Sequence, residues 1–121
     1  MNIALWIVSG LLALAFLMAG GMKASQPKSA LADRMGWVND FSDTQVKIIG
    51  ALEVAGAIGL ILPWLLDIAP ILTPIAALGL VLTMLGAAIV HLRRGETQMI
   101  VPNIVLGLLA LFVALGRFGI F

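Results

Sequence analysis

Four long runs of apolar residues alternate with short polar segments along the chain. The runs span about residues 3–22, 46–66, 71–92 and 100–118. Each run is long enough to cross a membrane, because a helix that rises about 1.5 Å per residue needs about 20 residues to span about 30 Å of hydrocarbon. The pattern therefore predicts four transmembrane helices, with both ends of the chain on the same side.

The polar segment between the first two runs, residues 23–45, is the longest. Pro27 and Ser29 mark a break in it, and Ser29 is placed to cap a short helix that continues to Arg34 or Gly36. Such a helix would lie along the membrane surface. A loop packed on the bundle accounts for the same residues equally well. The sequence thus predicts a short interfacial helix or loop at this point.

Local signals mark the boundaries of the other runs. Ser42, followed three residues later by Gln45, is a capping-box pattern and predicts the start of the second helix. Residues 67–70 predict a tight turn, and residues 95–99 predict another reversal of the chain. Because these connections are short, residues 1–121 are expected to form a single transmembrane domain.

The composition indicates that lipid, as well as water, surrounds this chain. Hydrophobic residues make up 62% of it and charged residues only 11%, with a mean hydropathy of +1.15. Soluble domains are typically about 45–50% apolar. A small soluble domain buries only about two-thirds of its surface, so it has no room to hide this many apolar side chains. The predicted fold class is therefore all-α, a transmembrane four-helix bundle.

The distribution of positive charge predicts an orientation. Of the seven Lys and Arg residues, six lie in or beside the first and third polar segments and one lies at the end of the fourth run: Lys23, Lys28, Arg34, Lys47, Arg93 and Arg94 against Arg117. By the positive-inside rule, loops 23–45 and 93–99 are expected in the cytoplasm and both termini outside, in the cell (inner) membrane. Trp6 and Trp64 are then expected near the outer interface. With a net charge of +1 and no clustered basic face, nucleic acid is not a predicted partner.

Glu53 lies about seven residues into the second run. An unpaired carboxylate at the centre of a membrane helix costs about 2.5 kcal/mol or more, so it must be protonated, paired or exposed to a polar cavity. Gly50, Ala57 and Leu60 share its helical face, and the small residues Gly50 and Ala57 allow a neighbouring helix to approach closely. Glu53 is therefore predicted to point into the bundle.

Three polar residues from the other runs are expected at a similar depth. Lys23 ends the first run, His91 lies at the end of the third, and Asn103 lies in the first turn of the fourth. A contact between Lys23 and Glu53 is within reach of the lysine stem, and His91 is a second candidate partner. This predicted polar cluster either binds a small molecule or holds the helices together.

The residues present exclude several kinds of chemistry. The chain has no cysteine, so it offers no disulfide, thiolate nucleophile or cysteine metal site. A metal site is not predicted, because the chain has one histidine and no second strong ligand spaced near it. No serine has an accompanying base at a diagnostic spacing. Catalytic residues are therefore not assigned, and we expect no catalytic activity of the chain on its own.

Several of these residues carry a resemblance to a known family. Residues 19–23 at the end of the first run, residues 50–53 with Gly56 in the second, and His91 at the end of the third together resemble the DoxX-like family of small four-span membrane proteins. The resemblance covers nearly the whole chain. It implies a membrane subunit, or a bundle that binds a quinone or another lipid, associated with redox or stress-defence partner proteins.

Other functions are compatible with the same residues. A proton-coupled exporter similar to the small multidrug resistance family has this length, span number and a membrane carboxylate, but that family carries its glutamate in the first span. A membrane enzyme would use Glu53 and His91 as acid and base, which requires both within reach of one substrate atom. A purely structural scaffold is the third alternative. The small-residue series Ala51, Ala55 and Gly59 suits packing within one chain or between copies of a homo-oligomer.

Overall fold

The computed structural model describes residues 1–31, 36 and 41–120. Its four long helices are α1 (Asn2–Ser25), α3 (Asp43–Leu66), α4 (Leu72–Arg93) and α5 (Thr97–Arg117). Each of the four is long and apolar enough to cross a membrane. The predicted transmembrane four-helix bundle is therefore confirmed.

Three of the four long helices, α1, α3 and α5, extend beyond the apolar runs that predicted them. α1 continues past Met22 to Ser25, and α3 and α5 begin at Asp43 and Thr97, ahead of their runs. Backbone hydrogen bonding continues into polar residues at the ends of a helix, whereas the apolar run ends with the hydrocarbon. These three helices are therefore longer than the segments that apolarity marks. α4 has the same length as its predicted run, 71–92, and is shifted by one residue.

The predicted capping box at the start of α3 is present. The backbone N–H of Gln45 donates to Ser42 Oγ at 3.1 Å, and the backbone N–H of Ser42 donates to Gln45 Oε1 at 2.9 Å. These two bonds satisfy donors that a helix start otherwise leaves without partners. They place the first turn of α3 where the sequence predicts it.

A short helix, α2 (Lys28–Leu31), follows α1. It begins one residue ahead of Ser29, so Ser29 lies inside the helix and not at its cap. The continuation predicted toward Arg34 falls outside the described residues. Leu31 is completely buried against Val46. This contact joins α2 to the start of α3.

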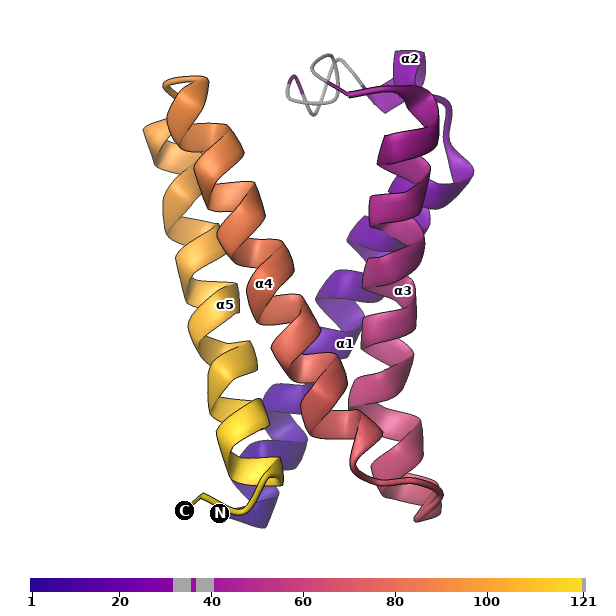
Figure 1. Ribbon diagram of the computed structural model, residues 1–121, viewed down its shortest axis with the longest axis vertical. Helices are drawn as coiled ribbons and strands as arrows, with labels where there is room; N and C mark the ends of the chain where they lie inside the picture. Colours follow the sequence, from indigo (N-terminus) through magenta and orange to yellow (C-terminus); the bar gives the residue numbers. More distant parts are fainter. Residues whose placement is uncertain (32–35, 37–40, 121) are drawn as a thin grey trace.

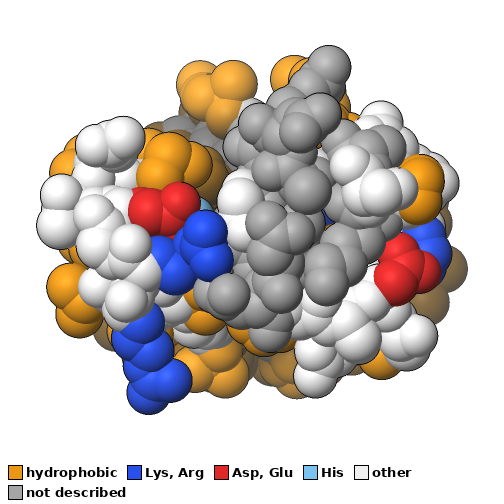
Figure 2. Space-filling view, turned by 90° about the horizontal axis from the view of Figure 1, so that it is seen from above, with side chains coloured by type: hydrophobic (Ala, Val, Ile, Leu, Met, Phe, Trp, Pro, Cys, Tyr) orange, Lys and Arg blue, Asp and Glu red, His pale blue; other side chains and the backbone are white. Residues whose placement is uncertain are grey.

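The four long helices form two pairs, as Figure 1 shows. α1 packs along α3, and α4 packs along α5. The pairs meet at the end where both chain termini and the α3–α4 turn lie, which we call the terminal end. They diverge toward the end that carries α2 and the α4–α5 turn, which we call the loop end. Charged side chains gather on the face of the loop end (Figure 2).

Small and medium apolar side chains fill the core between the pairs. Phe16 of α1 is the largest of them, and both Phe16 and Leu80 of α4 are almost fully buried. The remaining core residues are Leu12, Ala57, Leu60, Ala77, Met84, Ala110, Val113 and Ala114. Many large apolar side chains point outward instead, as expected where lipid is the solvent.

A proline in α3 creates a specific contact with α4. Pro63 has no N–H, so it leaves the carbonyl of Gly59, four residues earlier, without its helical donor. The hydroxyl of Thr73 donates to this carbonyl at 2.8 Å, and Thr73 is fully buried. A Cβ on Gly59 would lie 2.7 Å from the Cβ of Ala76. The helices thus pack closely near the terminal end.

Candidate functional site

Lys23 and Glu53 form an ion pair between α1 and α3. Lys23 Nζ donates to Glu53 Oε1 at 2.6 Å. The side chains are 12% and 2% exposed, respectively. The contact that the sequence left open is therefore made, and a carboxylate inside the second span has a compensating charge. Its inward direction is as predicted, since Glu53 lies on the buried face with Gly50, Ala57 and Leu60.

Two glycines bring the backbones of α1 and α3 close enough for this pair. A Cβ on Gly20 would lie 2.6 Å from the carbonyl oxygen of Gly50 and 2.9 Å from the Cβ of Glu53. A Cβ on Gly50 would lie 2.6 Å from the backbone N of Ala24. Real side chains do not tolerate such distances to backbone. The helices therefore cross backbone against backbone beside the ion pair.

The opposite directions of the two helices orient the charged side chains toward each other. Long helical side chains lean toward the N-terminus of their own helix. Lys23, near the end of α1, therefore leans back into the membrane, while Glu53 leans toward the loop end. A lysine at the end of one span thus reaches a glutamate inside the next.

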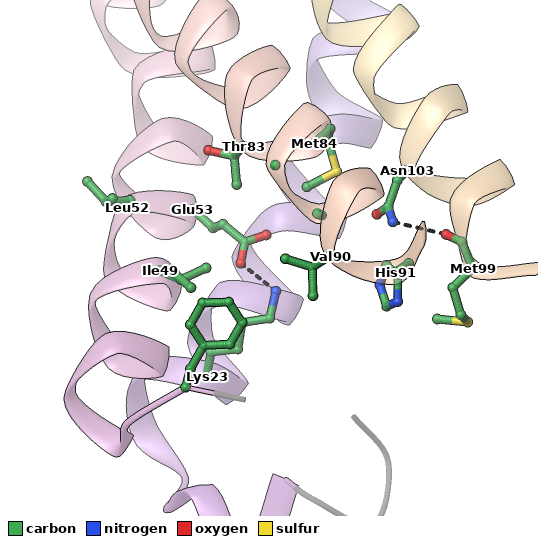
Figure 3. Close-up of a pocket in the computed structure, with 13 residues that line it drawn as sticks. Lys23, Ile49, Leu52, Glu53, Thr83, Met84, Val90, His91, Met99 and Asn103 are labelled. Atoms are coloured by element: carbon green, nitrogen blue, oxygen red, sulfur yellow. Dashed lines mark hydrogen bonds and ion pairs between the residues drawn. The ribbon is translucent and has the colours of Figure 1, made fainter. Parts of the chain in front are cut away.

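A cavity of about 490 Å³ lies beside the ion pair, between the two helix pairs. Its volume falls in the range of about 300–1,000 Å³ that is usual for small-molecule sites. Figure 3 shows Lys23 and Glu53 on one wall, with His91 and Asn103 across from them. Most of the wall is apolar: Phe41, Ile49, Leu52, Met84, Ala87, Val90 and Met99, together with Gly86 and Thr83. All four predicted site residues therefore line one cavity.

His91 and Asn103 line this cavity but bond to other residues than Glu53. Asn103 Nδ2 donates to the carbonyl of Met99 within α5, at 3.0 Å. His91 Nδ1 lies 3.1 Å from Glu96 Oε1, in the α4–α5 turn. His91 is therefore the partner of Glu96, and the direct bond to Glu53 is made by Lys23 alone among the four.

Glu96 is a residue of this region that sequence reasoning missed. Its Oε1 also accepts from Arg94 Nε at 3.0 Å. The hydrogen bond with His91, helped by Arg94, holds the pKa of Glu96 below its ordinary value, although partial burial opposes the shift. The available signal was its spacing, because Glu96 follows His91 by five residues across a turn closed by Gly95, whose φ is +72°.

A second polar cluster, also missed from the sequence, lies at the terminal end. Arg117 donates from Nη1 to Asn2 Oδ1 at 2.8 Å, and it is only 7% exposed. Its guanidinium carbon lies 5.1 Å from the ring centroid of Trp6 and 4.4 Å from that of Trp64. Cation–π contacts of this kind favour a partly desolvated cation. The cluster joins the ends of α1, α3 and α5.

Comparison with known families decides the membership of the chain. The sequence profile of the DoxX-like family matches residues 7–113. The chain belongs to the DoxX-like family. The match covers all four long helices at least in part, so it includes both the helix pairs and the cavity between them. A search of curated proteins and a search of solved structures each return no match.

The cavity of this DoxX-like protein has distinct binding properties. Its apolar walls suit an apolar molecule, and the ion pair supplies a fixed polar end. Among the described residues, no three His, Asp or Glu side chains gather in a way that would hold a metal ion. The lining residues offer apolar contacts and, at the buried ion pair, hydrogen bonds.

Proposed function

We propose that this DoxX-like protein binds a small lipophilic molecule, of the quinone or lipid class in size, in the cavity between its helix pairs. The observation that carries the proposal is the combination of an apolar cavity of about 490 Å³ with the Lys23–Glu53 ion pair on its wall. A buried ion pair is costly to maintain and adds little to stability compared with apolar residues of the same size. Ionisable residues inside a membrane usually mark a functional site.

The same proposal includes an orientation. The basic residues favour the loop end in the cytoplasm, with both termini outside, in the inner membrane. The cavity would then lie in the cytoplasmic half of the bundle. Redox or stress-defence partner proteins stay a prediction of the resemblance. Association between copies of the chain stays a prediction of the small-residue series Ala51, Ala55 and Gly59.

The ion pair favours binding over proton-coupled export. An exporter of that kind alternates its carboxylate between a proton and a substrate. In this chain Lys23 already compensates Glu53 at 2.6 Å. A scaffold without a ligand would need neither the cavity nor a carboxylate beside it.

Two glycines of α4 offer a matched test of the cavity. Gly86 lines it, and a Cβ there meets nothing within 4 Å, so Gly86→Leu narrows the cavity without a clash at Cβ. Gly79 lies two turns away on the same helical face, is equally open, and does not line the cavity. Gly79→Leu is therefore the control.

Native mass spectrometry of the purified protein in lipid nanodiscs is the experiment. Wild type and Gly79→Leu are expected to retain a small lipophile that is not a nanodisc lipid, and Gly86→Leu is expected to lose most of it. The proposal is overturned if wild type carries no such molecule, or if all three proteins carry it equally.

A further inference from the structure

The second carboxylate oxygen of Glu53 is directed into the cavity. Oε1 accepts from Lys23, and within the described part of the chain no hydrogen bond reaches Oε2. Figure 3 shows the other oxygen of this carboxylate on the side turned toward α4. The side chain is 98% buried, because only 2% of it is exposed. The cavity therefore has a built acceptor at its polar end.

The acceptor restricts what a ligand can place beside it. A carboxylate oxygen accepts hydrogen bonds and donates none. Buried polar atoms are nearly always hydrogen-bonded. A ligand acceptor placed against Glu53 Oε2 would leave both oxygens without a donor, which is unfavourable. A ligand that fills the cavity must therefore present an O–H or N–H to Glu53 Oε2.

The neighbouring charge restricts the ligand further. Lys23 Nζ lies 2.6 Å from Oε1, so the carboxylate already has its counter-charge. A cationic ligand at Oε2 would place a second positive charge close to Lys23 in a region of low dielectric, where repulsion between charges is strong. The polar group of the ligand is therefore neutral.

Resting on the proposed function, we propose that the ligand is a neutral lipophile that carries a hydroxyl group, such as a phenol or an alcohol, and that this hydroxyl donates to Glu53 Oε2. The apolar residues Ile49, Met84 and Val90 contact its hydrophobic body. The proposal separates this site from one that recognises an organic cation. It also separates this site from one that selects a ligand carrying acceptors alone, such as an oxidised quinone, so that a ligand of the quinone class would bind in its hydroxyl-bearing quinol form.

Matched probes test the hydroxyl directly. The affinities of para-octylphenol, its methyl ether para-octylanisole, and the cationic para-octylbenzylamine are measured on the protein in nanodiscs, with empty nanodiscs as the partition blank. The phenol is expected to bind about tenfold or more tightly than the ether, since a hydrogen bond to a charged acceptor contributes about 1.5–3 kcal/mol, equivalent to at least tenfold.

Two acid-to-amide variants test whether Glu53 is the residue that causes the preference for the phenol over the ether. Glu53→Gln replaces a carboxylate oxygen with an amide that donates, so the preference for the phenol over the ether is expected to disappear. Asp67→Asn makes the same chemical change at the terminal end, where the backbone is left-handed with φ of 53°, a conformation that asparagine accepts. This control is expected to keep the preference.

The outcomes distinguish this inference from the proposed function. Equal binding of phenol and ether, lost in Gly86→Leu, keeps the cavity as a lipophile site and overturns the hydroxyl inference. Tightest binding of the amine also overturns it. If no probe binds above the blank, both proposals fail. The comparison of probes on wild type decides the inference even where Glu53→Gln does not fold.

Discussion

Gly20 lies directly against Glu53, where α1 crosses α3. A Cβ at position 20 would be 2.9 Å from the Cβ of Glu53 and 2.6 Å from the carbonyl oxygen of Gly50. The carbonyl oxygen of Gly50 belongs to the α3 backbone, so it cannot move without shifting the helix. The absence of a side chain at this position is therefore a condition for the ion pair beside it.

Gly20→Ala is expected to lower the free energy of unfolding by about 1–3 kcal/mol, because overpacking forces the two helices apart. Gly21→Ala is the control, since a Cβ on Gly21 meets nothing within 4 Å. Unfolding curves in detergent compare the two variants. Equal stability of both would contradict the close crossing.

The two members of the ion pair are expected to depend on each other. Lys23→Met leaves a buried carboxylate without its charge partner, which typically costs about 3–5 kcal/mol. Adding Glu53→Gln to Lys23→Met removes that charge and is expected to recover most of the loss. A double-mutant cycle of unfolding free energies measures the coupling. Simple addition of the two single effects would show that the pair contributes no coupling.

The hydroxyl of Thr73 is expected to stabilise the packing of α3 on α4. Thr73→Val leaves the Gly59 carbonyl without a donor and is expected to cost about 1–2 kcal/mol. Thr83→Val is the comparison, because Thr83 donates only to Gly79 in its own helix, at 2.9 Å. If the Tm falls equally in Thr73→Val and Thr83→Val, the hydrogen bond between α3 and α4 adds no stability beyond that of a bond within one helix.

Glu96 gives the fold a dependence on pH. Its pKa is lowered in the folded chain, so its charged form contributes stability above its ordinary pKa of 4.5, and that contribution is lost as the pH falls through the lowered value. The difference in Tm between wild type and Glu96→Gln is therefore expected to shrink as the pH is lowered from about 6 to about 3. A difference in Tm that grows toward acid pH would contradict a lowered pKa of Glu96 in the folded chain.

The bundle was predictable because its signal is long and redundant. Apolar runs of about 20 residues specify spans, and the Ser42–Gln45 pattern specifies a helix start by two local hydrogen bonds. The short α2 was less well predicted, since Ser29 lies inside it. A single polar residue is weak evidence for the start of a four-residue helix.

Part of the polar lining of the cavity was predictable from the sequence, and most of the bonds of these polar residues were not. The depth along each run placed Lys23, Glu53, His91 and Asn103 at one level, and all four line the cavity. Depth alone does not fix the direction of a side chain around its helix. The bond between His91 and Glu96, and the packing of Arg117 between Trp6 and Trp64, both depend on directions that only the assembled bundle sets.

The most direct test of a hydroxyl-bearing lipophile in the cavity is photolabelling. A phenol with a diazirine on its alkyl chain is added to the protein in nanodiscs, and the sample is irradiated. Mass spectrometry then maps the labelled residues. We expect the label on the cavity residues Ile49, Met84 and Val90, and its loss when excess para-octylphenol competes. Label spread over lipid-facing residues such as Leu11 and Leu82, unchanged by the competitor, would contradict the account.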